Sequence, residues 1–237
     1  MRHDGKMILF IGVSRSGKSV PVKRIVEKQK RVLAFDPKGE YVAQMGFKGF
    51  TDKGEFLKAV RNCSGAGKFA LIASDPKSFQ FFCDVAFNWN RQAPAAIVCE
   101  ELAAVTNSSK AAGAWGRLIN QGLAYQPLII GTVQRGQEVD KTLMNNASFV
   151  HVCRHNTDDD AAYIASKLGI PVTEIPREPL QFFQWTSDKG IVCRGVIDFK
   201  GASGKNWKEG SPRFRAKGKA KLLTLTDSGE FQGVIYR

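Results

Sequence analysis

The sequence of 237 residues predicts an α/β fold, a doubly wound and mostly parallel sheet with a β-rich, basic C-terminal extension. Short apolar stretches rich in Ile, Val and Leu alternate with stretches of helical character, as buried parallel strands alternate with their crossover helices. After Pro179 the pattern changes to short strand-like stretches separated by turns that contain glycine. We therefore expect a core over residues 1–178 and an extension over residues 179–237, packed on the core or on a neighbouring subunit.

The expected strands of the core are apolar, and they lie at residues 7–11, 31–35, 69–73, 95–99 and 128–132. Helices are expected at residues 54–62, 78–91, 111–124 and 158–168, and also just after residue 19. The helix at 158–168 has Asn156 or Thr157 as its N-cap, three aspartates that complement the helix dipole, and Gly169 at its end. Strands of the extension are expected at 180–185, 190–199, 221–226 and 231–236.

A glycine-rich segment at residues 12–19 follows the first strand and precedes the first helix, which is the context that a nucleotide-phosphate loop requires. Gly12 and Gly17 permit backbone N–H groups to approach phosphates closely at the helix N-terminus. Lys18 would contact the β- and γ-phosphates, and the Ser19 hydroxyl would complete the shell of a Mg²⁺ ion. The residues expected to bind the nucleotide are Gly12, Ser14, Arg15, Ser16, Gly17, Lys18, Ser19 and Val20.

Polar residues end two later strands, at the carboxyl edge where a doubly wound sheet binds its ligands. Glu100 and Glu101 follow the strand at 95–99, and Gln134 follows the strand at 128–132. We expect Glu100 to act in the Mg²⁺ shell through water, Glu101 to polarise the attacking water, and Gln134 to sense the γ-phosphate. The alternative is that all three are solvated loop residues. With Lys18, they are the expected catalytic residues, and ATP and Mg²⁺ are the expected cofactors.

The order of these motifs resembles that of the FtsK/HerA superfamily of DNA-pumping ATPases, over about residues 7–170. The most discriminating motif is the turn after the second strand, Asp36-Pro37-Lys38-Gly39-Glu40-Tyr41. Further matches lie at residues 134–135, 138–140 and 145–147. The resemblance implies a RecA-like P-loop NTPase core, Mg²⁺-dependent ATP hydrolysis and assembly into a ring, expected to be a hexamer. The compact length is most similar to that of the genome-packaging ATPases of tailless, membrane-containing icosahedral double-stranded DNA viruses.

The chain departs from the family pattern at two positions. Glu100 stands where the family more often has aspartate, although the longer side chain can still reach a metal-bound water. Leu123 stands where many members have an arginine that would act across a subunit boundary. Candidates for this arginine finger elsewhere in the chain are Arg91, Arg117, Arg135 and Arg154, and the alternative for each is an exposed ion pair.

The formal net charge of +13 indicates a polyanionic partner, either nucleic acid or an anionic membrane surface; the alternative is a charged surface that serves solubility. Between residues 200 and 221 there are eight basic side chains and one acid, Glu209, with Trp207 and Phe214 among them. Basic residues interleaved with aromatic ones suit contact with a nucleic-acid backbone and its bases, although a solvated loop has the same composition. The residues expected to contact DNA are Lys205, Lys208, Arg213, Arg215, Lys217, Lys219 and Lys221.

The five cysteines lie far apart and form no CxxC pair, which is typical of reduced, buried thiols in a reducing compartment. His151, Cys153 and His155 alternate as on one face of a strand, but a fourth metal ligand is not nearby in the sequence. No apolar stretch approaches the roughly 20 residues that span a bilayer. The sequence before the first strand does not resemble a signal peptide, so we expect a cytoplasmic protein.

The resemblance and the charge together predict ATP-driven translocation of double-stranded DNA without sequence preference, into a preformed viral capsid. Expected partners are a capsid vertex or membrane proteins of the virion, and expected locations are the host cytoplasm and the virion. One alternative is an assembly ATPase of the filamentous-phage type, which extrudes virions through a membrane. Others are a small-molecule phosphotransferase, such as a nucleotide kinase, and a structural DNA- or capsid-binding protein with a degenerate nucleotide site.

Overall fold

The computed structural model describes residues 5–198, 213–216, 222–225 and 231–234. The strands, in chain order, are β1 (Lys6–Ile11), β2 (Arg31–Phe35), β3 (Lys48–Phe50), β4 (Gly67–Leu71), β5 (Ala96–Cys99), β6 (Leu128–Val133), β7 (Phe149–Cys153), β8 (Gln181–Thr186), β9 (Gly190–Asp198), β10 (Arg213–Ala216), β11 (Leu222–Leu225) and β12 (Phe231–Val234). The α-helices are α1 (Ser19–Lys28), α2 (Glu40–Met45), α3 (Lys53–Arg61), α4 (Pro76–Gln92), α5 (Gly113–Asn120), α6 (Lys141–Asn146) and α7 (Asp158–Leu168).

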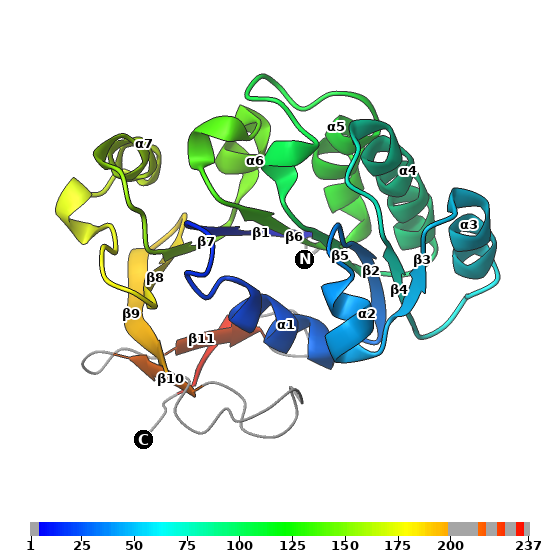
Figure 1. Cartoon of the computed structure of the whole chain (residues 1–237), viewed down its shortest axis with the longest axis horizontal. Coiled ribbons are helices and arrows are strands. Elements are labelled where there is room, and N and C mark those ends of the chain that lie inside the picture. Colours follow the sequence, from blue (N-terminus) through cyan, green and yellow to red (C-terminus); the bar gives the residue numbers. More distant parts are fainter. Residues whose placement is uncertain (1–4, 199–212, 217–221, 226–230, 235–237) are drawn as a thin grey trace.

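Ten of these strands form one sheet in the order β10-β9-β8-β7-β1-β6-β5-β2-β4-β3, and β11 pairs with β12 separately. Helices cover both faces of the sheet (Figure 1): α1 and α2 lie on one face, and α3, α4, α5 and α6 lie on the other. Every residue of β5 and β6 is buried, which explains why these strands are apolar along their whole length. The expected doubly wound, mostly parallel sheet is confirmed.

The strands that follow Pro179 continue this sheet beyond β7. β8 pairs antiparallel with β7, β9 with β8, and β10 with β9, whereas the strands from β1 to β7 pair in parallel. Phe182 of β8, and Cys193 and Ile197 of β9, form a small apolar cluster with Val20 of α1. The extension therefore packs against the first turn of the helix that follows the glycine-rich segment.

Several elements differ from the sequence expectation. α2, β3, α6, β7 and β10 were not predicted, and each has six residues or fewer. The single helix expected at 111–124 is instead α5 followed by a separate 3₁₀ turn, Gly122–Tyr125. The break coincides with Gly122, a residue that weakens helices. In α7, by contrast, the expected caps are present: the Thr157 hydroxyl accepts the Asp160 N–H at 3.3 Å, and Gly169 has φ of 65°.

Candidate active site

The glycine-rich segment joins β1 to α1, and its backbone leaves no room for larger residues at two positions. Gly12 has φ of 150°, and a Cβ there would lie 2.8 Å from the Cβ of Cys153. Gly17 has φ of 96°, and a Cβ there would lie 2.4 Å from the Cδ1 of Ile197. Contacts of this length require displacement of neighbouring atoms, so strands β7 and β9 fit the loop only because residues 12 and 17 are glycines.

Lys18 folds back onto this loop. Its Nζ donates to the carbonyl oxygens of Gly12, at 2.5 Å, and of Val13, at 2.8 Å. Burial lowers the pKa of Lys18 below its ordinary value, because the charged form is poorly solvated there. The two carbonyls therefore hold the ammonium group of Lys18 against the glycine-rich segment.

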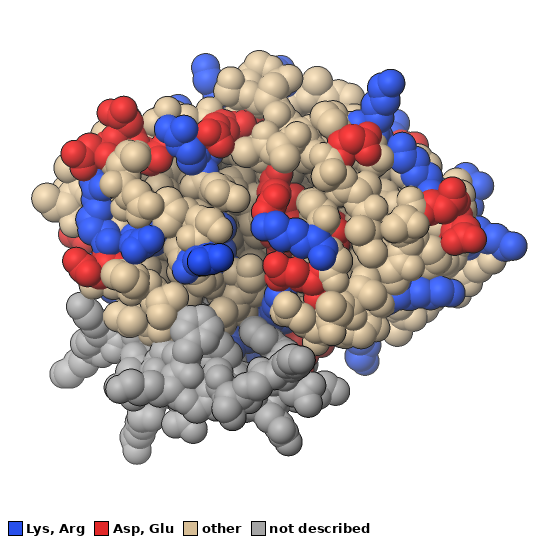
Figure 2. Space-filling view, in the orientation of Figure 1, with Lys and Arg blue, Asp and Glu red and all other residues tan. Residues whose placement is uncertain are grey.

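The loop opens onto a cavity of about 440 Å³ at the carboxyl ends of the strands. Seven of the expected site residues line it together: Ser14, Arg15, Lys18, Ser19, Glu100, Glu101 and Gln134. The other loop residues do not line the cavity; Ser16 and the Val20 side chain are buried behind it. Seven further lining residues were not predicted as site residues: Asp36, Pro37, Lys38, Glu40, Tyr41, Thr132 and Val133. In Figure 2, acidic and basic side chains lie side by side near the centre of this face of the molecule.

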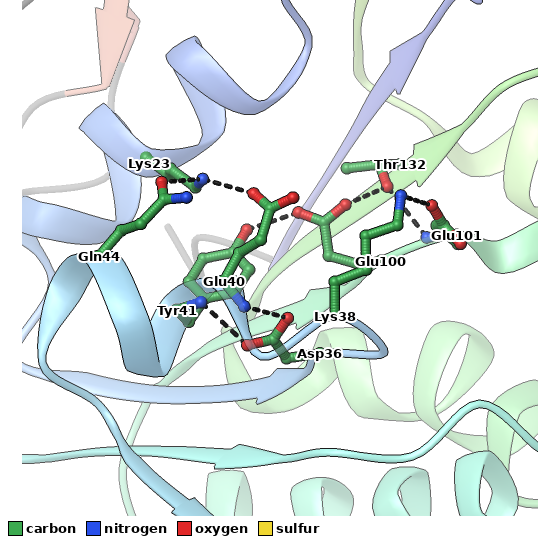
Figure 3. Close-up of polar contacts among 9 residues, drawn as sticks. All are labelled: Lys23, Asp36, Lys38, Glu40, Tyr41, Gln44, Glu100, Glu101 and Thr132. Carbon is green, nitrogen blue, oxygen red and sulfur yellow. Dashed lines mark hydrogen bonds and ion pairs between the residues drawn. The ribbon is translucent and has the colours of Figure 1, made fainter. Parts of the chain in front are cut away.

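Glu100 lines the cavity, is partly buried and accepts two hydrogen bonds. Tyr41 Oη donates to Glu100 Oε1 at 2.6 Å, and Thr132 Oγ1 donates to Glu100 Oε2 (Figure 3). Burial raises the pKa of Glu100, and the two hydrogen bonds act in the opposite direction because they stabilise the ionised carboxylate. The Ser19 hydroxyl and the Glu100 carboxylate line the same cavity, and oxygen donors of these two kinds fit Mg²⁺.

Glu101 lies at the mouth of the cavity, in a left-handed backbone conformation with φ of 52°. Its N–H donates to Thr132 Oγ1 at 3.1 Å, so the Thr132 hydroxyl contacts both acidic residues. The Glu101 carboxylate forms an ion pair with Lys38, and this contact raises the pKa of the Lys38 ammonium group. The acid expected to polarise water is thus at the cavity, with a lysine as its partner.

The turn between β2 and α2 supplies the residues that contact both acids. The Asp36 carboxylate accepts the backbone N–H groups of Glu40, at 3.0 Å, and Tyr41, at 2.9 Å, and so stabilises the first turn of α2. A contact with α1 also holds α2 in place: Lys23 Nζ of α1 donates to Glu40 Oε2 and to Gln44 Oε1 of α2, both at 2.6 Å (Figure 3). The motif at 36–41 was conspicuous in the sequence, but nothing in it indicated contacts with residues 100 and 101.

None of the four candidate finger arginines lines this cavity. Arg135 Nε donates to Asp160 Oδ1 at 3.0 Å, and Arg135 also pairs with Glu138 at 3.2 Å. The Arg91 and Arg117 guanidinium groups lie 6.0 and 4.9 Å from the centre of the Phe87 ring. For Arg154, the buried Nε has no hydrogen-bond partner among the described residues.

The two other features noted in the sequence take structural roles in the described part of the chain. His151 is buried and stacks on Phe182, with 4.7 Å between ring centres. No group of three or more His, Cys, Asp or Glu side chains is arranged for a metal ion within these residues. Cys83, Cys99, Cys153 and Cys193 are buried free thiols, and Cys63 is partly exposed.

Most of the basic segment of the extension lies outside the residues that the structure describes. Lys205, Lys208, Lys217, Lys219 and Lys221 lie outside the described residues, and Arg213 and Arg215 lie in β10, whose backbone alone is described. Within the ranges that the structure describes, the helices are too short or too polar to cross a membrane.

Comparison with known proteins shows that the chain has the P-loop NTPase fold. No model of a known protein family matches the sequence. Protein P9 of Pseudoalteromonas phage PM2 is 29% identical over 190 residues, which cover 76% of this chain and 84% of that protein. The genome packaging NTPase B204 from Sulfolobus turreted icosahedral virus 2, in complex with ATP-gammaS, has a TM-score of 0.64 at 11% identity and covers 78% of this chain and 94% of its own.

A second solved structure has the same fold. The pCW3 conjugation coupling protein TcpA, in its monomer form with ATPgS, has a TM-score of 0.52 at 13% identity; the match covers 80% of this chain and 59% of that chain. The chain therefore has the P-loop NTPase fold of these structures, and it is similar to Protein P9 of phage PM2 and to the genome packaging NTPase B204.

Proposed function

We propose that this protein is a Mg²⁺-dependent ATPase that moves double-stranded DNA, packaging a viral genome into a preformed capsid. One observation carries the proposal: the phosphate loop, both acids and the strand-end glutamine surround a single cavity. Phosphoryl transfer to water needs little more from a protein than positioned cations, a group that orients the water, and a metal site. The residues around this cavity are of those kinds.

Each residue has a defined task in this proposal. Lys18 leaves the Gly12 and Val13 carbonyls and contacts the β- and γ-phosphates, while loop N–H groups bind the phosphate oxygens. Glu101 orients and polarises the attacking water, and Gln134 detects loss of the γ-phosphate. Mg²⁺, held by Ser19 and through water by Glu100, would neutralise charge that develops on the phosphates.

Three observations support DNA as the cargo. The net charge of +13 suits a polyanion, the relative of 29% identity is a phage protein, and a structural neighbour is a genome packaging NTPase. Contacts to phosphates contain no sequence information, so binding is expected to be sequence-independent and to weaken with salt. A homo-oligomeric ring, expected to be a hexamer, would act at a capsid vertex or on virion membrane proteins, in the host cytoplasm and in the virion.

Substitution of the catalytic residues tests hydrolysis. Lys18→Ala and Glu101→Gln are each expected to abolish ATP turnover while the circular dichroism spectrum and melting temperature stay near those of wild type. Lys189→Ala is the control, because Lys189 is an exposed lysine that pairs with Asp188 on the turn between β8 and β9. Unchanged turnover in both test variants would exclude the motor assignment.

Neutralisation of the basic extension tests the DNA contact. The triple variant Lys217→Gln, Lys219→Gln and Lys221→Gln is expected to bind duplex DNA more weakly and with a shallower dependence on salt. A control of equal net charge changes Lys48, Lys53 and Lys58, on β3 and α3 at the opposite end of the sheet, to Gln. If both triple variants lose the same affinity, overall charge rather than the extension determines binding.

A further inference from the structure

Lys38 is a second lysine at the phosphate cavity, and it is paired with Glu101. We propose that Lys38 exchanges Glu101 for the γ-phosphate when ATP enters, so that ATP binding itself releases the acid that orients water. The inference rests on the proposed ATP hydrolysis and adds a substrate-contacting residue to it. In this scheme Lys38 occupies the Oε1 oxygen of Glu101 until a γ-phosphate is present.

The position of Lys38 is determined by the turn that contains it. The Gly39 N–H donates to the Asp36 carbonyl at 3.2 Å, Pro37 occupies the second position, and Gly39 has φ of 67°. This tight turn fixes the Lys38 backbone at the carboxyl end of β2, next to the end of β5. The side chain is 59% exposed and extends across the cavity mouth to Glu101 (Figure 3). A fixed backbone with a long, exposed side chain permits an exchange of partners without rearrangement of the fold.

Among the carboxylates that line the cavity, Glu101 is the one paired with an exposed side chain at the mouth. Asp36 accepts backbone N–H groups of α2, and Glu40 pairs with the buried Lys23. Glu100 accepts hydrogen bonds from Tyr41 and Thr132 inside the cavity. The Glu101 backbone is fixed by its N–H bond to Thr132, so separation of Lys38 from Glu101 requires movement of the two side chains alone.

Electrostatics favour the exchange once a γ-phosphate is in place. A γ-phosphate bound beside Lys18 carries more negative charge than the Glu101 carboxylate, so it competes with that carboxylate for the Lys38 ammonium group. A lysine ammonium is a compact charge on a flexible stem, with three donors for phosphate oxygens. The contact with Glu101 raises the pKa of Lys38, so the side chain is cationic at neutral pH.

A comparison of two nucleotides tests the exchange by binding alone. Affinities of ATPγS and ADP are measured with Mg²⁺ for wild type, Lys38→Met, Lys38→Arg and the control Lys189→Met. Loss of a charge-assisted hydrogen bond to the γ-phosphate is expected to weaken ATPγS binding about ten-fold or more in Lys38→Met, with ADP affinity within about two-fold of wild type. Lys38→Arg retains a cation and is expected to keep most of the preference for ATPγS, and Lys189→Met is expected to match wild type.

Three results would overturn the inference. In the first, Lys38→Met loses the same affinity for ATPγS as for ADP. In the second, Lys38→Met binds both nucleotides as tightly as wild type. In the third, the Lys38→Met protein no longer folds, which would assign Lys38 a structural role. Melting without nucleotide detects the third result. ATP turnover by the wild-type protein is measured separately: if wild type binds both nucleotides and hydrolyses none, the proposed function fails, while the two affinities still report whether Lys38 contacts the γ-phosphate.

Discussion

Ile197 of β9 lies against Gly17 of the phosphate loop, so closely that a Cβ on residue 17 would come within 2.4 Å of the isoleucine Cδ1. Ile197 is 1% exposed. It belongs to an apolar cluster whose other buried members are Val20, Cys153, Phe182 and Cys193. A strand of the C-terminal extension therefore forms the wall behind a loop near the N-terminus. Because Ile197 contacts the loop, movement of the loop is expected to displace β9. In the sequence, β9 is followed by the basic segment that begins at residue 200.

Ile197→Ala is expected to weaken both the fold and nucleotide binding. Truncation leaves a cavity in a buried cluster and should lower the free energy of unfolding by about 2–5 kcal/mol, as measured by urea denaturation. Because the loop loses its support, ATPγS affinity should fall as well. Ile191→Ala, a partly buried position on the same strand that packs on the main core, is the control. If the two variants lose the same affinity, the contact with Gly17 has no special role.

His151→Leu is expected to increase stability in acid. Burial lowers the pKa of His151 from 6.5 to about 3, and its ring nitrogens have no hydrogen-bond partner within the described residues. Unfolded chains take up the proton first as the pH falls below 6.5, so the folded state loses stability progressively between pH 6.5 and about 3. At pH 5 this amounts to about 2 kcal/mol for one such histidine. Urea denaturation at pH 8 and pH 5 measures the difference, and a gain of the same size at both would contradict this explanation.

Tyr41→Phe is expected to destabilise the protein by about 1–3 kcal/mol at pH 7, because it removes one of two donors from a buried carboxylate. The loss of that donor also raises the pKa of Glu100 further, in the same direction as burial. Tyr125→Phe is the matched control, since the Tyr125 ring is partly exposed and lies by Phe87. Equal unfolding free energies for the two variants would show that the Tyr41 hydroxyl contributes nothing to stability.

We expect the arginine finger to be Arg91 or Arg117. Rings assembled from two kinds of variant subunit test this prediction. A finger given to a neighbour must come from a surface away from the chain's own cavity. Arg91 lies in the last turn of α4, before the start of β5 and so away from the carboxyl ends of the strands, and the Arg91 and Arg117 guanidinium groups both lie near the Phe87 ring. Arg117 pairs with Asp84, whose side chain is 50% exposed, whereas Arg135 pairs with Asp160, whose side chain is buried.

The experiment mixes Lys18→Ala subunits with subunits of each Arg→Ala variant. An interface is active when the arginine variant supplies the loop and the Lys18→Ala subunit supplies the finger. In an equal mixture each side of an interface is the required subunit with a probability of one half, so about a quarter of the interfaces are active. Recovery of ATP turnover is expected for Arg91 or Arg117. Recovery for Arg135 or Arg154 alone would reject this assignment.

Strands were predictable where both faces are buried. β5, β2 after Arg31, and β6 apart from Thr132 lack polar side chains because helices cover both sides of the sheet, and hydropathy detects that. α2 and β3 were missed because six and three residues provide too little periodicity. Their existence depends on tertiary contacts, such as the bond from Lys23 to Glu40, which join residues that are remote in sequence.

The candidate site was predictable only in part, for a related physical reason. The loop, Glu100, Glu101 and Gln134 were located because each stands at a strand end. Residues 36–41 contact Glu100 and Glu101 because β2 is adjacent to β5 in the sheet. The order of strands in a sheet cannot be read from the sequence of any one strand. Lys38 and Glu101 are 63 residues apart in sequence, so spacing alone could not associate them.

The place of β1 in the sheet has a consequence for biosynthesis. β1 pairs with β6 and β7, and the loop that follows it is fixed by bonds from Gly12 N–H to the Val133 carbonyl and from Val13 N–H to the Arg154 carbonyl. Pairing across such long sequence separations forms late, because closure of a long chain must precede the contacts. On the ribosome, the glycine-rich loop at residues 12–19 therefore cannot reach this conformation until the chain has grown past residue 154. Nascent chains arrested before that length should bind no ATP.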